Sequence, residues 1–103
     1  MPVVVVATVR PEPEHREEVL AAFKEAIPAV HAEPGCELYA LNEGADRLVM
    51  VEQWSSLEAL QTHSRAAALQ KLGPAIEGKL SAPTEVLTFE PVPAGDQDKG
   101  RLR

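Results

Sequence analysis

Cysteine is nearly absent from this sequence of 103 residues, which contains only Cys36. One cysteine cannot form a disulfide within the chain, and no second cysteine lies nearby to suggest a metal or redox pair. We therefore expect Cys36 to be a small buried residue at the start of a strand. The sequence also lacks His, Cys, Asp and Glu at metal-ligand spacing, and it has no G-x-G-x-x-G, P-loop or G-x-S-x-G motif. It gives no support to a bound metal, a bound nucleotide or serine hydrolysis.

Long apolar runs are missing as well. The longest wholly apolar run, residues 3–7, is far shorter than the roughly 20 residues that cross a bilayer, and no basic segment precedes it as in a secretory signal. We therefore expect a cytoplasmic protein with no membrane partner. Basic residues are also few, because 10 Lys and Arg stand against 16 Asp and Glu and the net charge is -6. This charge opposes binding to a phosphate backbone, so nucleic acid is not an expected partner.

The composition, with 45% hydrophobic and 25% charged residues, is that of an ordinary globular protein. The chain length suits one domain, because a second core would need more chain. From residue 91 onward the sequence is rich in proline, glycine and mixed charge. We therefore expect one domain over residues 1–90 and an exposed, partly disordered tail over residues 91–103.

Strands and helices are expected to alternate in the order β-α-β-β-α-β. β-Branched and apolar residues predict strands at residues 2–9, 36–42, 48–54 and 84–89. Apolar residues at helical spacing predict a long helix that begins near Pro13 and ends at residues 33–35. They are Val19, Leu20, Phe23, Ile27 and Val30. Pro28 is expected to kink this helix.

Residues 43–47 form a short polar link, so the second and third strands are expected to be a hairpin that leads directly into a helix. Ser55 and Glu58 have the S-x-x-E spacing of a capping box, and Trp54 then stands where it would pack on Ala59 as a hydrophobic staple. This helix is expected to reach about His63. A further helical stretch covers residues 65–80 and should break or bend sharply where Gly73 precedes Pro74.

This order is that of an α+β, ferredoxin-like sandwich, with both helices on one face of a four-stranded antiparallel sheet. The first and third strands have apolar residues on both faces, but two helices cover only one face. For a chain this small, a second copy related by a two-fold axis is the simplest cover for the other face. We therefore predict a homodimer in which the two sheets face each other.

Two motifs in the hairpin and the helix after it resemble a known family. They are E-P-G-C-x-x-Y, which starts at Glu33, and V-E-x-W-x-S-x-E-A-L-x-x-H, which ends at His63. Both are similar to the antibiotic biosynthesis monooxygenase family of the dimeric α+β barrel superfamily, and the resemblance covers about residues 3–89. It implies a dimer with a small cavity in each subunit between the helices and the sheet. Because this fold hosts several chemistries, the resemblance identifies the family more specifically than the activity.

The resemblance implies a choice among several activities. Similar members include oxygenases that oxidise quinols or polyphenols with dioxygen and without metal or flavin, so no cofactor is expected. Haem-opening relatives use an asparagine on the first strand and a histidine on the last helical stretch, where this chain has Ala7 and about Gly73. Haem degradation is therefore disfavoured. Many relatives also carry a second histidine five residues after the first, but here that position holds Ala68, which argues against a mechanism with paired histidines.

His63 is the candidate catalytic base. An imidazole can take a proton from a phenol near neutral pH, and the alternative is a histidine on the helix surface or at its cap. Trp54 and Tyr39 are candidate substrate-binding walls, with core packing as the alternative. Glu52 is either a buried carboxylate with a raised pKa and a partner, or an edge residue that reaches solvent.

The resemblance, together with His63 as a possible base, therefore implies a monooxygenase without a cofactor that oxidises a small phenolic or quinol-like ligand with dioxygen. Two alternatives use the same cavity. One is a non-catalytic dimeric protein that binds a small molecule, as in a stress response, and the other is an isomerase of a small carbonyl compound. The sequence does not specify the substrate. The remaining histidines have structural explanations, because His15 should be solvated and His31 should end a helix, where a cation favours the dipole.

Overall fold

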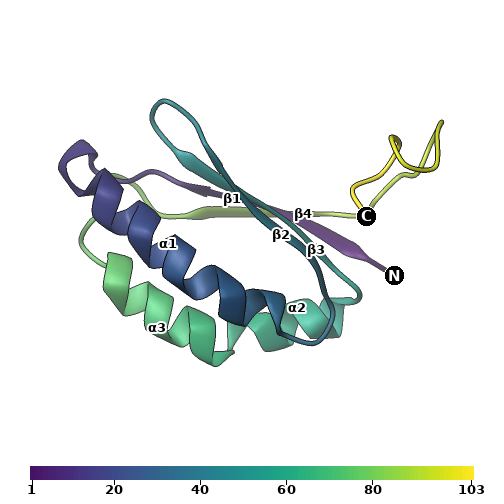
Figure 1. Cartoon of the computed structure of the whole chain (residues 1–103), viewed down its shortest axis with the longest axis horizontal. Coiled ribbons are helices and arrows are strands. Elements are labelled where there is room, and N and C mark those ends of the chain that lie inside the picture. The colour runs from purple at the N-terminus through teal and green to yellow at the C-terminus, as the bar shows by residue number, and fades with distance from the viewer.

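Four antiparallel strands form one sheet in the order β2-β3-β1-β4. The computed structural model describes residues 1–103 and gives the bounds of the strands as β1 Val3–Val9, β2 Cys36–Glu43, β3 Leu48–Trp54 and β4 Glu85–Phe89. The helices α1 (Arg16–His31), α2 (Leu57–Ser64) and α3 (Ala67–Ile76) lie on one face of the sheet (Figure 1), and the short 3-10 turn η1 (Pro13–His15) leads into α1. The predicted α+β, ferredoxin-like fold is confirmed.

The core lies between the sheet and the helices. Because side chains alternate across a strand, every second residue of β1 and β3 points toward the helices. Val5, Val9, Leu48, Met50 and Trp54 on these strands are at most 2% exposed. Val19, Phe23 and Val30 of α1 are buried against them, as the helical spacing predicts. The strands and α1 therefore share one apolar layer.

The opposite face of the sheet carries no helix. Val4 and Val6 of β1 alternate with the core residues, and in the register of the sheet they lie beside Phe89 and Leu87 of β4. Leu87 and Phe89 are 47% and 48% exposed. The sheet thus has an apolar outer face with large hydrophobic side chains in contact with solvent.

Helix α2 starts one residue later than the capping-box spacing predicts. Ser56, not Ser55, is the N-cap, and its side-chain oxygen accepts a hydrogen bond of 3.1 Å from the backbone N–H of Ala59. The expected box between Ser55 and Glu58 is therefore wrong, and so is the staple that depended on it. Ser55 instead donates its backbone N–H to the carbonyl of Gly35, at 2.9 Å, and so remains part of the β3 end of the structure.

The expected break at Gly73 and Pro74 is also wrong. Helix α3 continues through both residues to Ile76, and the N–H of Glu77 still bonds the carbonyl of Gly73. A proline inside a helix removes one backbone donor, but α3 packs along α1 over its length (Figure 1), and this packing keeps the helix intact. Helix α1 likewise contains Pro28 and continues to His31.

The loop after α3 is tied to the loop after β1. Leu80 forms an isolated antiparallel bridge with Pro11, and Ser81 donates its backbone N–H to the carbonyl of Arg10 at 2.7 Å. These bonds hold the chain between α3 and β4 in place at one end of the sheet.

The C-terminal residues 91–103 contain no helix or strand and are almost entirely exposed. Their end touches the sheet, because the side-chain amide of Gln53 donates to the carbonyl of Arg103 at 3.1 Å. No helix anywhere in the chain combines the length and apolarity that spanning a bilayer requires.

Candidate functional site

A cavity of about 300 Å³ lies between the helices and the sheet. Strands β1, β2, β3 and β4 form its floor, and residues from all three helices cover it. We call this hollow the cavity. The residues that line it are Val5, Ala7, Val9, Phe23, Tyr39, Met50, Glu52, Leu60, His63, Ser64, Leu69, Leu72, Gly73, Ile76, Thr84 and Val86.

Three of the lining side chains can hydrogen-bond a ligand from buried positions. They are Tyr39, Glu52 and His63, which are 6%, 5% and 4% exposed. Tyr39 on β2 and Glu52 on β3 are register partners, so both point to the helix side at the same level of the sheet. His63 reaches the same place from the last turn of α2. A small set of polar groups converging in a mainly apolar hollow is typical of a small-molecule site.

His63 is held by contacts on two sides. Its Nδ1 lies 2.8 Å from Oε1 of Glu33, and its ring stacks on the indole of Trp54 with 4.4 Å between the ring centroids. A carboxylate on Nδ1 fixes that nitrogen as the proton carrier and leaves Nε2 as the free acceptor. Nε2 has no hydrogen-bond partner within the chain.

Glu33 is a site residue that the sequence did not predict. It stands in the turn before β2, thirty residues from His63, and its Oε2 atom is buried without a hydrogen-bond partner. The E-P-G-C motif contains Glu33, but nothing in a motif of one segment indicates contact with a histidine in another. The pair is visible only once the turn and α2 are placed beside each other.

Glu52 is buried, which decides between the two alternatives that the sequence left open. The indole N–H of Trp54 donates to its Oε1 at 2.9 Å. Burial raises the pKa of Glu52 above its ordinary value, and the nearby Glu33 carboxylate adds to this, while the Trp54 hydrogen bond and His63 act in the opposite direction. The Oε2 atom of Glu52 has no partner within the chain, so it can meet a ligand.

Trp54 does not line the cavity, in contrast to the expectation that it forms a wall. The indole is fully buried behind the two residues that it contacts, Glu52 and His63. The indole ring stacks on the imidazole of His63, and the indole N–H donates to the carboxylate of Glu52. Trp54 thus positions two lining residues without reaching the cavity itself.

Tyr39 faces the cavity as predicted. Its ring meets His63 edge to face, with 5.5 Å between the centroids, and its hydroxyl makes no hydrogen bond within the chain. Burial raises the pKa of Tyr39 well above its ordinary value, with further contributions from the negative charges of Glu52 and Glu33. The hydroxyl therefore stays protonated and can donate to a bound oxygen atom.

The other residues singled out in the sequence lie apart from these groups. Cys36 is half-buried and does not line the cavity, and burial raises the pKa of its thiol. His15 pairs with Glu18 at 3.0 Å on the surface. His31 lies at the end of α1, where its Nε2 is 3.0 Å from the carbonyl oxygen of Tyr39. No group of three or more His, Cys, Asp or Glu side chains is placed to hold a metal ion.

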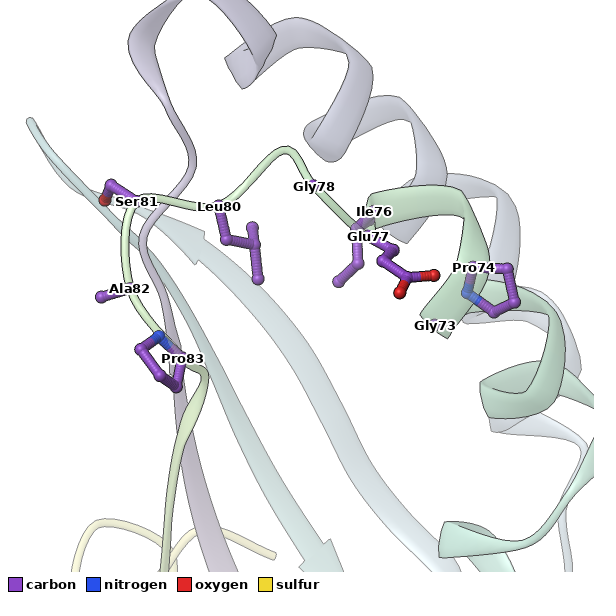
Figure 2. A pocket seen from close by; sticks show the side chains of 9 residues that line it. All are labelled: Gly73, Pro74, Ile76, Glu77, Gly78, Leu80, Ser81, Ala82 and Pro83. Carbon is purple, nitrogen blue, oxygen red and sulfur yellow. The ribbon is translucent and has the colours of Figure 1, made fainter.

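A second, larger hollow of about 710 Å³ lies between the end of α3 and the loop that leads to β4. We call it the groove, and Figure 2 shows it. It is lined by Gly73, Pro74, Ile76, Glu77, Gly78, Leu80, Ser81, Ala82 and Pro83. Although it is larger than the cavity, its only ionisable residue is Glu77, which is exposed, so it lacks the convergent buried polar groups of a reaction site.

The buried Glu52 predicts a specific dependence of stability on pH. Because the folded state keeps this proton to a higher pH than the unfolded state, the free energy of unfolding should fall as pH rises from the ordinary glutamate value of 4.5 to the raised value. Glu52→Gln cannot ionise, and its amide oxygen can still accept from Trp54. The stability of this variant relative to the original protein should therefore increase across that range and then level off.

Chemical denaturation between about pH 4 and pH 8 measures this difference. Glu58→Gln, on the exposed first turn of α2, makes the same chemical change outside the cavity, and its effect is subtracted. His63, Glu33 and Tyr39 face the same space and remain in both proteins. A difference that is constant with pH after this subtraction would contradict the raised pKa.

Comparison with known proteins points to one family. The family model of antibiotic biosynthesis monooxygenases matches residues 2–73. The chain is 31% identical over 80 residues to the probable quinol monooxygenase YgiN of Escherichia coli (strain K12), and the match covers 67% of this chain and 77% of that protein.

Solved structures agree on the fold. Rv0793 from Mycobacterium tuberculosis is 28% identical with a TM-score of 0.86, and the alignment covers 93% of this chain and all of that one. A putative antibiotic biosynthesis monooxygenase from Caulobacter crescentus is 23% identical with a TM-score of 0.83, over 88% of this chain and 90% of that one. At that level of identity the second structure supports the fold alone.

Proposed function

The chain belongs to the antibiotic biosynthesis monooxygenase family, and on that premise we propose that it is a cofactor-independent monooxygenase that oxidises a small phenolic or quinol-like molecule with dioxygen. The observation that carries the proposal is that His63, whose Nδ1 is paired with Glu33 and whose Nε2 has no partner within the chain, lines a mainly apolar cavity. A phenol needs little more than a base and a dry pocket to become reactive toward dioxygen.

In the proposed reaction His63 is the catalytic base. Its Nε2 takes the proton of the substrate hydroxyl, and the Glu33 carboxylate on Nδ1–H stabilises the imidazolium that forms. The Tyr39 hydroxyl, which burial keeps protonated, donates to a substrate oxygen and orients the ring. Glu52 offers its free oxygen to a second polar group of the substrate.

The reaction balances without an external reductant. A hydroquinone and dioxygen give a hydroxyquinone and water: one oxygen atom forms a new carbon–oxygen bond, and the other leaves as water. The substrate supplies both hydrogen atoms of that water and all four electrons. The phenolate that His63 produces is the electron-rich form from which these electrons leave.

Oxygen uptake with a panel of hydroquinones and phenols tests the proposal. We expect dioxygen consumption that persists with a chelator, stops under nitrogen, and places one atom of labelled dioxygen in the product. Product formation under nitrogen would indicate an isomerase instead. Thermal stabilisation by aromatic ligands without any turnover would indicate a non-catalytic binding protein.

We further propose that two copies pair through the outer face of the sheet. This face exposes apolar side chains, and Leu87 and Phe89 are each about half exposed in the single chain. Burying such side chains in a two-fold interface removes them from water, which favours association. The same interface would cover the apolar residues that alternate with the core residues of β1 and β3.

Leu87→Glu tests this pairing, because it places a charge within the proposed interface. We expect the original chain to sediment as a dimer and the variant to dissociate with an affinity roughly thirtyfold weaker or more. Val92→Glu makes a similar change at a residue of the tail that is 83% exposed, and it should leave the dimer intact. An original chain that sediments as a monomer would rule the pairing out.

A further inference from the structure

The cavity and the groove are neighbours. Gly73 and Ile76 of α3 line both hollows, so the two spaces meet at the C-terminal end of this helix. The cavity holds the polar groups Tyr39, Glu52 and His63, and the groove continues from it along the loop between α3 and β4. A molecule longer than the cavity can therefore extend into the groove without crossing a layer of the fold.

The space beside Gly73, one of the two shared residues, is open. Gly73 has no side chain, and a Cβ atom added there would meet no atom within 4 Å. Val86 lines the same cavity and is 58% exposed, because β4 is the edge strand of the sheet. The cavity is therefore open to solvent at Gly73 and Val86, whereas Tyr39, Glu52 and His63 are buried.

The groove presents apolar walls. In Figure 2 the side chains of Ile76 and Leu80 extend from α3 and from the following loop into the same space, and Pro83 lies at the other end. Backbone bonds to the loop after β1 hold Leu80 and Ser81 in position. The one charged lining residue, Glu77, is negative, and it would repel an anionic group.

We propose that the groove binds an uncharged apolar chain carried by the aromatic ring that the cavity holds. The inference rests on the proposed function and names the substrate class: a phenol or quinol with a hydrocarbon substituent on the side away from the hydroxyl that meets His63. The hydroxyl and the ring occupy the cavity, the substituent leaves it beside Gly73, and the chain lies against Ile76 and Leu80. A substituent that ends in a carboxylate binds less well because of Glu77.

Binding of 4-alkylphenols by isothermal titration calorimetry under nitrogen tests the inference without any oxidation. In these probes the chain points away from the hydroxyl. From 4-ethylphenol to 4-butylphenol to 4-hexylphenol we expect the affinity to increase by up to roughly fourfold for each methylene that the groove buries. An affinity that does not depend on chain length would overturn the proposal.

Two variants test whether the gain in affinity with chain length comes from binding in the groove or only from the greater hydrophobicity of a longer probe. Gly73→Leu fills the junction and Leu80→Ser removes an apolar wall, and in both the ratio of hexylphenol to ethylphenol affinity should fall toward one. Gln70→Leu adds the same side chain on an exposed position of α3 outside both hollows, and it should keep the original ratio. An unchanged ratio in Gly73→Leu, measured on a protein with a normal melting transition, contradicts the exit of the substituent beside Gly73.

Oxygen uptake with 2-alkylhydroquinones separates this inference from the proposed function. If affinity increases with chain length but no probe is oxidised, the groove inference is supported and the oxygenase proposal fails. If hydroquinones are oxidised, but neither the rate nor the affinity depends on the length of the alkyl chain, the oxygenase proposal is supported and the groove inference fails.

Discussion

Replacing His63 with asparagine should lower kcat/KM for hydroquinone oxidation by roughly 10²–10⁴-fold, which is the usual contribution of a general base. Asparagine is a selective change here. Its side-chain N–H₂ stands close to where Nδ1 of the imidazole was, so it can still donate to Glu33, but it has no counterpart of Nε2 at the cavity. The variant therefore removes the proposed proton acceptor and keeps the buried hydrogen bond.

The measurement is initial oxygen uptake across substrate concentrations, with melting curves to show that the variant is folded. His15→Asn is the matched control, since His15 lies on the surface and pairs with Glu18 outside the cavity. Glu33→Gln should lower kcat/KM roughly ten- to a hundredfold, because it replaces the charged hydrogen bond to His63 by a neutral one. Equal rates in His63→Asn and the original protein would remove His63 as the base.

Replacing Gly35 with alanine should destabilise the protein by roughly 2–5 kcal/mol, the combined size of left-handed strain and overpacking. Gly35 has a φ of +84°, a conformation that an alanine adopts only with strain. An added Cβ would also lie 2.5 Å from Cβ of Ala59 and 2.7 Å from Oγ of Ser55. Gly35 lies in the turn that contains Glu33, and this turn packs against the start of α2. The backbone of the turn must therefore move to relieve the clash.

Gly78→Ala separates the two causes. Gly78 also has a positive φ, of +78°, but an added Cβ would meet nothing within 4 Å. Its cost should therefore be the strain alone, roughly 1–2 kcal/mol. Denaturant titration of both variants gives the difference, which measures the close approach at Gly35. If the two variants lose the same stability, the contact with Ala59 and Ser55 is not tight.

Local patterns in the sequence were sufficient for the strands, the hairpin and the apolar side of α1. These features depend on how apolar and polar residues alternate or are spaced within one segment, so the sequence of that segment is enough to predict them. The predictions that were wrong concern the start of α2, with the capping box and staple that depended on it, and the break expected in α3. Packing of α3 along α1 outweighs the one hydrogen bond lost at Pro74, and the choice between Ser55 and Ser56 as cap depends on the bond from Ser55 to Gly35.

The site residues likewise fall into those that the sequence predicts and those that only the folded structure shows. His63, Tyr39 and Glu52 could be selected from residue type and from the resemblance of two motifs, and all three line the cavity. The partnership of Glu33 with His63 and the place of Trp54 behind both polar residues could not. Each of these depends on how far β2, β3 and α2 approach one another in space.

By itself, therefore, the sequence determined the order of the elements, the one-sided apolar character of α1 and the family of the chain. The tertiary structure alone decided which polar atoms remain free, which carboxylate supports the histidine, and where the cavity meets the groove. The physical reason is range: periodicity and turn chemistry act between residues near in sequence, whereas burial and hydrogen-bond pairing depend on segments brought together only by folding.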